Sequence, residues 1–257
     1  MSSVRIKEFT EFTYTLAEKS GEIIKCYFAD GNLALEIKED QTPVTQADRQ
    51  AETVMRDLIR KTYPQHGILG EEFGRENASA EFVWTLDPID GTISFVRGCP
   101  LFGTLIGLLH GGTPILGAIN QPVLNQLCIG NNIETTINGR AVRLRETDHL
   151  SKAMLLTTDV VSIGQYQKKQ GFEKLLKQTR LFRTWGDCYG YLLVAWGGAD
   201  IMLDPIMNPW DILPLVPIIQ GAHGVITTWS GTDAANGNSS VAANKTLHPQ
   251  VLEILNS

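Results

Sequence analysis

The spacing of apolar residues changes twice along the chain, and this change constrains the fold more than any other sequence feature. Residues 6–28 and 46–63 place apolar side chains three or four positions apart, which predicts two amphipathic helices. From residue 82 to about residue 145, short apolar runs are separated by hairpin signals, which predicts a mostly antiparallel sheet. Beyond residue 151, strand-like and helix-like stretches alternate. Such alternation predicts layered α and β elements that share a sheet.

The bulk properties of the chain narrow the class of protein. A length of 257 residues suits one large domain or two small ones, and we predict one compact domain over 1–257 with a soft subdivision into 1–150 and 151–257. The net charge of −6 argues against a broad nucleic-acid surface, which needs clustered lysines and arginines. The cysteines form no CxxC pair, and no apolar run is long enough to span a membrane. We therefore expect a cytoplasmic protein that binds neither nucleic acid nor membrane.

The sequence DPIDGT at residues 87–92 is the strongest candidate for a functional site. Asp87 and Asp90 lie three positions apart across a proline that fixes the backbone, so we expect a sharp turn at the end of a strand. An isolated D-x-x-D is most often only a turn, but two carboxylates held this close also favour a bound cation. Gly91 and Thr92 follow, and free N–H groups at a helix start would bind phosphate there. Metal ligands beside an anion site indicate phosphoryl chemistry.

Two further carboxylates flank this segment in the sequence. Glu71 lies in the loop-like sequence LGEEFG, and Asp211 follows Trp210 at the expected start of a late helix. Each has a structural explanation, because adjacent loop glutamates are usually solvated and the helix dipole favours an aspartate in the first turn. Their order along the chain, G-E-E, then D-P-I-D-G-T, then W-D, argues against these separate explanations.

This order closely resembles the signature of the inositol monophosphatase family of magnesium-dependent, lithium-sensitive phosphatases. The likeness covers nearly the whole chain, including TPVTQAD at 42–48 and GGAD at 197–200. The resemblance implies an α+β fold, a layered αβαβα sandwich, and hydrolysis by a water that Mg²⁺ activates, without a covalent intermediate. The implied Mg²⁺ ligands are Glu71, Asp87, Asp90, Asp211 and the carbonyl oxygen of Ile89.

The same resemblance assigns further roles around the metal. Glu71 and Thr92 would position the water that attacks phosphorus, and Asp90 would act with them as a catalytic residue. The N–H groups of Gly91 and Thr92 would hold the phosphate. Asp48 and Lys38 resemble family residues that lie near the metals. For Asp48 the alternative of a helix first-turn acid remains open.

The choice of substrate depends on a later segment. RTWGDCYGYLLVA at 183–195 and DPIMNPWD at 204–211 resemble the histidinol-phosphate phosphatase branch of the family. That branch implies hydrolysis of L-histidinol phosphate to L-histidinol and phosphate, in histidine biosynthesis, and a homodimer. The ammonium and imidazole groups of this substrate would be attracted by nearby carboxylates. The candidate substrate contacts beyond the phosphate are Asp187, Asp204, Trp185 and Asn208.

Each of these candidates has a structural alternative: a helix-start acid for Asp187, a strand-end turn for Asp204, packing for Trp185 and a helix cap for Asn208. Ile93 replaces a basic residue that is frequent in this branch. Inositol-1-phosphate or another small phosphate ester is therefore the first rival substrate. A non-catalytic regulator that binds metal or ligand is the rival from another class, and the intact set of carboxylates argues against it.

Overall fold

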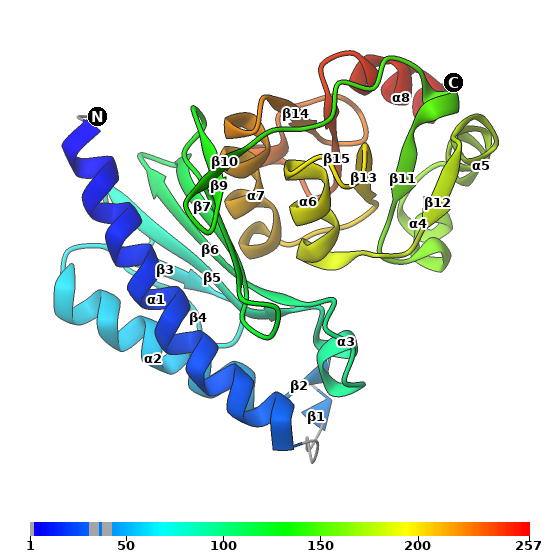
Figure 1. Cartoon of the computed structure of the whole chain (residues 1–257). Helices are drawn as coiled ribbons and strands as arrows, with labels where there is room; N and C mark the ends of the chain where they lie inside the picture. Colours follow the sequence, from blue (N-terminus) through cyan, green and yellow to red (C-terminus); the bar gives the residue numbers. More distant parts are fainter. Residues whose placement is uncertain (1–2, 31–35, 38–42) are drawn as a thin grey trace.

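The computed structural model describes residues 3–30, 36–37 and 43–257 (Figure 1). Lys38, which the family resemblance places near the metals, lies outside the described residues. A small sheet pairs β1 (Glu36–Ile37) with β2 (Pro43–Val44). Among the described residues, no helix combines the length and the apolar character that a membrane span requires.

Two long helices form the first layer, as their apolar spacing predicts. α1 (Ser3–Asp30) and α2 (Gln46–Thr62) pack against each other on one face of an eight-stranded sheet (Figure 1). Buried aromatic and aliphatic side chains, among them Phe9 and Trp84, fill the space between these helices and the sheet. This first core fixes α2 over the strands that carry the site.

The eight-stranded sheet has the strand order β10-β9-β8-β7-β6-β5-β3-β4. Its neighbouring strands are antiparallel except β3 and β5, which are parallel. The mostly antiparallel sheet predicted for this half is therefore present. Its strands are β3 (Gly67–Gly70), β4 (Gly74–Glu76), β5 (Phe82–Asp90), β6 (Gly103–His110), β7 (Thr113–Gln121), β8 (Gln126–Gly130), β9 (Thr135–Ile137) and β10 (Arg140–Val142).

The second half of the chain builds a five-stranded sheet with the order β12-β11-β13-β15-β14. β11 pairs in parallel with β12 and with β13, whereas β15 runs antiparallel to both of its neighbours. The carboxyl ends of the three parallel strands therefore lie at the same edge of the sheet. The strands are β11 (Met154–Leu156), β12 (Leu181–Arg183), β13 (Ile201–Asp204), β14 (Gly224–Thr227) and β15 (Ser240–Asn244).

The remaining helices complete an αβαβα arrangement, as the family resemblance implies. α6 and α7 lie between the two sheets, and α5 and α8 cover the outer face of the five-stranded sheet (Figure 1). α3 and α4 are short and follow β5 and β11. The bounds are α3 (Thr92–Val96), α4 (Val160–Tyr166), α5 (Lys169–Gln178), α6 (Asp187–Ala195), α7 (Pro209–Gly221) and α8 (Leu247–Asn256), with 3₁₀ turns at Leu150–Lys152 and Ala234–Asn236.

α7 rests directly on the eight-stranded sheet because glycines line its path. A Cβ at Gly117 would lie 1.8 Å from the carbonyl oxygen of Pro214, and one at Gly130 would lie 2.4 Å from the Cα of Ile218. No side chain fits at either position, so the backbone of the helix approaches β7 and β8 closely. This contact fixes the start of α7, and with it Asp211, beside the end of β5.

Candidate active site

Asp87 and Asp90 lie at the end of β5, where the pairing of β5 with β6 is irregular. We expected a sharp turn at Pro88, but β5 continues through it, and its register against β6 shifts between Asp87 and Asp90. Residues three apart in a regular strand point to opposite faces, whereas an inserted residue returns both to one side. The Pro88 carbonyl oxygen accepts the hydroxyl of Thr104 at 2.8 Å, which anchors this irregular stretch.

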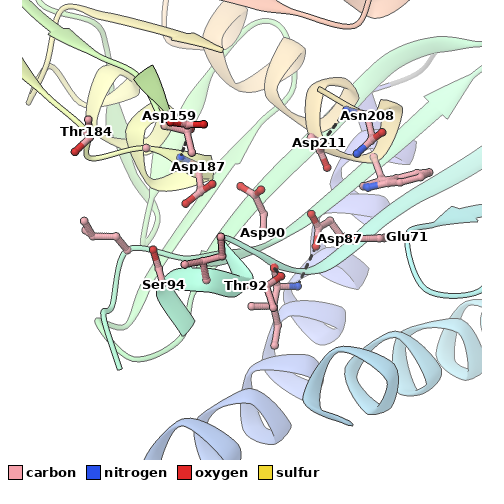
Figure 2. A pocket seen from close by; sticks show the side chains of 17 residues that line it. Glu71, Asp87, Asp90, Thr92, Ser94, Asp159, Thr184, Asp187, Asn208 and Asp211 are labelled. Atoms are coloured by element: carbon pink, nitrogen blue, oxygen red, sulfur yellow. Dashed lines mark hydrogen bonds between the residues drawn. The ribbon is translucent and has the colours of Figure 1, made fainter. Parts of the chain in front are cut away.

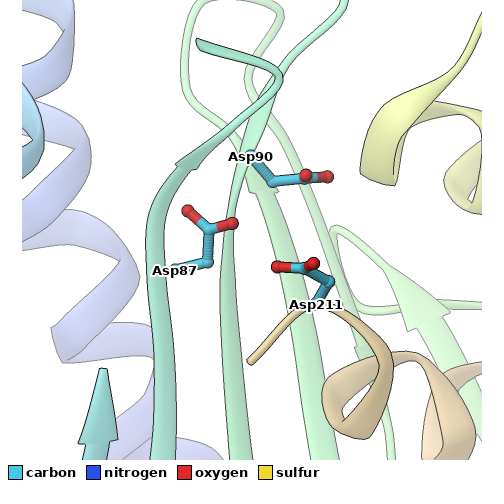
Figure 3. Close-up of side chains that lie close together, drawn as sticks. All are labelled: Asp87, Asp90 and Asp211. Carbon is cyan, nitrogen blue, oxygen red and sulfur yellow. The ribbon is translucent and has the colours of Figure 1, made fainter. Parts of the chain in front are cut away.

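Asp211 completes a cluster of three carboxylates. Carboxylate oxygens of Asp87, Asp90 and Asp211 all lie within 4.8 Å of one another (Figure 3). Asp211 comes from the first turn of α7, where its Oδ2 accepts the N–H of Asn208 at 2.7 Å. Burial, together with repulsion from neighbouring carboxylates, raises the pKa of Asp90 to about 8, that of Asp211 to about 7, and that of Asp87 well above its ordinary value. This donor set fits a divalent cation, because a cation removes the repulsion.

Glu71 reaches the same cleft from the turn between β3 and β4. Its N–H donates to the carbonyl oxygen of Leu86 at 3.1 Å, which ties it to β5 one residue before Asp87. After burial, the charge of Glu71 is the largest contribution to the raised pKa of Asp87. The charge of Glu71 therefore acts on Asp87, although its carboxylate is not part of the cluster of three within 4.8 Å.

Asp48 lies buried at the first turn of α2. Its Oδ2 accepts the N–H of Thr45 at 2.9 Å and the Thr45 hydroxyl at 2.6 Å, as part of a capping box. Burial raises its pKa to about 6, and repulsion from Glu71 adds to the effect. Asp48 thus caps the helix, and its charge also acts on the acidic cluster.

The motif ends in the short helix α3, where Gly91 and Thr92 line the cleft. Gly91 has a φ of 90°, and a Cβ there would lie 3.0 Å from Oδ2 of Asp187. Glycine is therefore required by both the backbone conformation and the approach of the carboxylate. The Thr92 hydroxyl donates to the carbonyl oxygen of Ile89 at 3.1 Å, so its own oxygen can still accept a hydrogen bond.

Asp187 begins α6 in a left-handed conformation, with a φ of 50° that is uncommon for a residue with a Cβ. Its N–H donates to the hydroxyl of Thr158 at 2.8 Å, and the next N–H, of Cys188, donates to Oδ2 of Asp90. Burial, and then repulsion from Asp90, raises the pKa of Asp187 well above its ordinary value. The start of α6 is therefore fastened to Asp90, and the Asp187 carboxylate lies over Gly91.

These side chains surround one cleft of about 430 Å³ (Figure 2). None of the described residues that line it is a lysine, an arginine or a histidine. An anionic substrate therefore needs cations from elsewhere before it can enter. The site residues predicted from sequence that line this cleft are Glu71, Asp87, Ile89, Asp90, Gly91, Thr92, Asp187, Asn208 and Asp211.

Sequence reasoning missed several lining residues that follow strands of the five-stranded sheet. Thr158 and Asp159 come just after β11, and Thr184 comes just after β12. Figure 2 shows Asp159, Thr184 and Asp187 at one end of the cleft, opposite the end with Asp87 and Asp211. The sequence shows polar residues after each of these strands. They lie together in the cleft only because β11 and β12 are parallel, which places their carboxyl ends at one edge of the sheet. Trp210 was also missed.

Two predicted substrate residues, Asp204 and Trp185, are not among the residues that line the cleft. Asp204 is 5% exposed, and its carboxylate accepts the hydroxyl of Tyr191 at 2.8 Å and the N–H of Thr158 at 3.2 Å. It lines an adjoining cavity of about 230 Å³ that shares Asp187 with the cleft. Trp185 is 42% exposed. Both therefore lie beside the site, and Asp204 is held by bonds within the protein.

Comparison with known proteins defines the class. A model described as the inositol monophosphatase family matches residues 5–257, so the chain belongs to this family and is one of its phosphatases. It is 38% identical to the bifunctional phosphatase IMPL2, chloroplastic, of Arabidopsis thaliana, over 99% of this chain and 77% of the relative. It is 36% identical to a histidinol-phosphatase of Chlorobaculum parvum, over 90% of each chain.

The fold leads to the same class. The structure is similar to that of an inositol monophosphatase from Zymomonas mobilis, with a TM-score of 0.88, 32% identity and full coverage of both chains. The αβαβα sandwich predicted from the resemblance is therefore confirmed. The relatives carry different substrate names, so the substrate of this chain is a separate question.

Proposed function

We propose that this phosphatase hydrolyses L-histidinol phosphate to L-histidinol and phosphate, with Mg²⁺ as its cofactor. The observation that carries the proposal is an acidic cleft with two ends. One end holds the carboxylates of Asp87, Asp90 and Asp211 within 4.8 Å of one another. The other end holds Asp187 and Asp159, with no lysine, arginine or histidine among the described lining residues. The first end suits a metal with a phosphate, and the second suits a cationic leaving group.

The metal end is built from hard oxygen donors, which Mg²⁺ prefers. Asp87, Asp90, Asp211, Glu71 and the carbonyl of Ile89 would hold it. When bound, Mg²⁺ supplies the positive charge that offsets the phosphate oxygens and lowers the pKa of an attacking water. The raised pKa values of the clustered aspartates agree with this role, because metal binding would displace their protons.

The residues of the chain would align the reaction. Glu71 and Thr92 would orient the attacking water: the Thr92 hydroxyl donates to Ile89, so its oxygen is left to accept a hydrogen bond from the water. Glu71 is fixed to β5 through its N–H and would take one proton from the water as a general base; the other proton would stay on the phosphate, and the leaving alcohol oxygen would gain a proton in return. The N–H groups of Gly91 and Thr92 would bind phosphate oxygens.

The far end of the cleft supports a cationic leaving group. The Asp187 carboxylate is largely buried among other acids, and a cation beside it would relieve the repulsion that raises its pKa. Asp159 lines the same end, although its carboxylate also caps α4 by accepting the N–H of Val161 at 2.8 Å. A neutral polyol would offer only hydroxyl groups here. Asn208 is the N-cap residue of α7 and lines the cleft, so its amide side chain would be a further substrate contact.

A panel of phosphate esters tests the proposal against its rivals. Purified protein with Mg²⁺ would be assayed for phosphate release from L-histidinol phosphate, inositol-1-phosphate and 3′-phosphoadenosine 5′-phosphate. The proposal predicts the highest kcat/KM for histidinol phosphate. A higher kcat/KM for inositol-1-phosphate would favour the rival substrate. Metal binding without release from any ester would favour a non-catalytic regulator.

A further inference from the structure

α2 carries a buried ion pair that lies outside the cleft. Glu52 and Arg56 are one helical turn apart, and their side chains are 0% and 4% exposed. Oε1 of Glu52 accepts the Nε–H of Arg56 at 2.8 Å. Burying two charges is unfavourable unless further hydrogen bonds satisfy both of them. The other partners of the pair therefore indicate what it does.

Those partners are backbone groups of the turn between β3 and β4 and of Gly74, the first residue of β4. The Glu52 carboxylate accepts the N–H of Glu72 at 2.8 Å and the N–H of Phe73 at 3.3 Å. The guanidinium of Arg56 donates to the carbonyl oxygen of Gly74 at 2.5 Å. The pair thus fastens successive backbone groups of this turn to α2.

The turn depends on this support because of its place in the sheet. β4 is the edge strand and pairs with β3 alone in the part of the chain that the structure describes. A Cβ at Gly70 would lie 2.0 Å from Oε1 of Glu52, so the carboxylate occupies space that only glycine leaves open. On its other side, Glu71 donates its N–H to Leu86 of β5 at 3.1 Å. Glu71 is therefore held between β5 and the buried pair.

We infer that Glu52 and Arg56 are positioning residues, which hold the Glu71 carboxylate in the cleft through the backbone of this turn. The inference rests on the proposed function, in which Glu71 binds metal and orients water. Neither residue of the pair lines the cleft, so any effect on a bound metal is indirect. Loss of the pair would free the turn and weaken metal binding while the rest of the cluster stays in place.

The experiment compares Glu52→Gln with Glu76→Gln as a matched control. An amide at position 52 offers one acceptor oxygen, turns an NH₂ group toward the remaining donor and leaves Arg56 without its buried partner. Glu76 accepts from the same arginine at 3.3 Å, and its carboxylate takes none of the bonds from the turn N–H groups. Two quantities are measured: Mn²⁺ affinity by titration calorimetry, and hydrogen exchange of the Glu72 and Phe73 amides in metal-free protein.

The inference predicts that Glu52→Gln weakens Mn²⁺ binding about tenfold or more and speeds exchange of the two amides, while the control changes neither appreciably. Wild-type Mn²⁺ affinity and wild-type exchange in the folded variant would overturn it. Should Glu52→Gln fail to fold, Glu52→Asp replaces it with the same expected results, since it keeps the charge but is too short to reach both N–H groups. Neither measurement uses phosphate release. A wild-type protein that hydrolyses no ester would therefore overturn the proposed function, and amide exchange would still decide the inference.

Discussion

Replacement of Asp90 by asparagine is expected to make the metal-free protein more stable and also inactive. Carboxylate oxygens of Asp90, Asp87 and Asp211 all lie within 4.8 Å of one another. Burial, and then repulsion from Asp211, raises its pKa from 3.8 to about 8. At pH 7 the folded protein must therefore keep this carboxyl protonated, which costs about 4 kcal/mol at about 1.4 kcal/mol per pH unit.

Asparagine removes this cost and keeps an oxygen that can accept the N–H of Cys188. The gain is smaller than this cost, because the asparagine amide is itself a polar group that loses water when it is buried. We therefore expect a gain of about 1–2 kcal/mol, which raises the Tm by about 3–6 °C for a chain of this size. In the proposed site the variant would also lose a charged metal ligand, so Mg²⁺ should no longer raise the Tm and activity should fall below about 1%.

Scanning calorimetry in EDTA and in excess Mg²⁺, with phosphate release on the same samples, measures all three effects. Asp148→Asn is the control, because it removes the same charge from an exposed side chain that pairs with Lys152 at 2.9 Å. Its Tm, Mg²⁺ response and activity should stay close to wild type. A lower metal-free Tm for Asp90→Asn, or a Mg²⁺ response equal to that of the control, would refute the reasoning.

Three further changes test other parts of the site. In EDTA, calorimetry should show the Tm falling as pH rises from about 4 to about 8. The pKa values of Asp90 and Asp211 are raised in the folded protein, so their contribution to stability is complete below their ordinary pKa and is lost as pH passes about 7 for Asp211 and about 8 for Asp90. A Tm that rises over this range would contradict the prediction. Asp187→Ala should lower kcat/KM for histidinol phosphate at least about tenfold more than for inositol-1-phosphate, whereas equal losses would indicate a purely structural role at the start of α6. Gly91→Ala should destabilise the protein by about 1–2 kcal/mol in urea denaturation and reduce activity, because φ is 90° and the new Cβ meets Asp187; an unchanged urea midpoint would show that the site adapts.

Many of the helices and hairpins could be predicted, because the spacing of apolar residues along the chain indicates them. The apolar spacing of residues 46–63 predicted α2 to within one residue of its observed end, and Asn138-Gly139 predicted the β9–β10 hairpin. The irregular continuation of β5 through Pro88 could not be predicted, because it depends on pairing with β6 and on the Thr104 hydroxyl. The αβαβα order itself came from the family resemblance, since periodicity does not give the order of strands in a sheet.

The candidate site was predictable where its residues lie in one motif or in a family signature. Asp211 comes together with Asp87 from 124 positions away, and only the resemblance connected them in the sequence. Asp159 was missed because its place depends on which strands of the second sheet are parallel. The Asp204 carboxylate is buried beside the cleft, where it accepts hydrogen bonds from Thr158 and Tyr191. The sequence does not show which residues will meet in this way.

The central claim is that the end of the cleft with Asp187 and Asp159 selects an ester whose alcohol part is cationic. The ratio of kcat/KM for L-histidinol phosphate to kcat/KM for inositol-1-phosphate tests this claim most directly. The measurement uses wild-type protein in saturating Mg²⁺ near neutral pH, where the substrate ammonium is charged. We predict a ratio of at least about 100, because inositol-1-phosphate has a neutral alcohol part and would leave a buried carboxylate without a cation. A ratio near or below one would contradict the account.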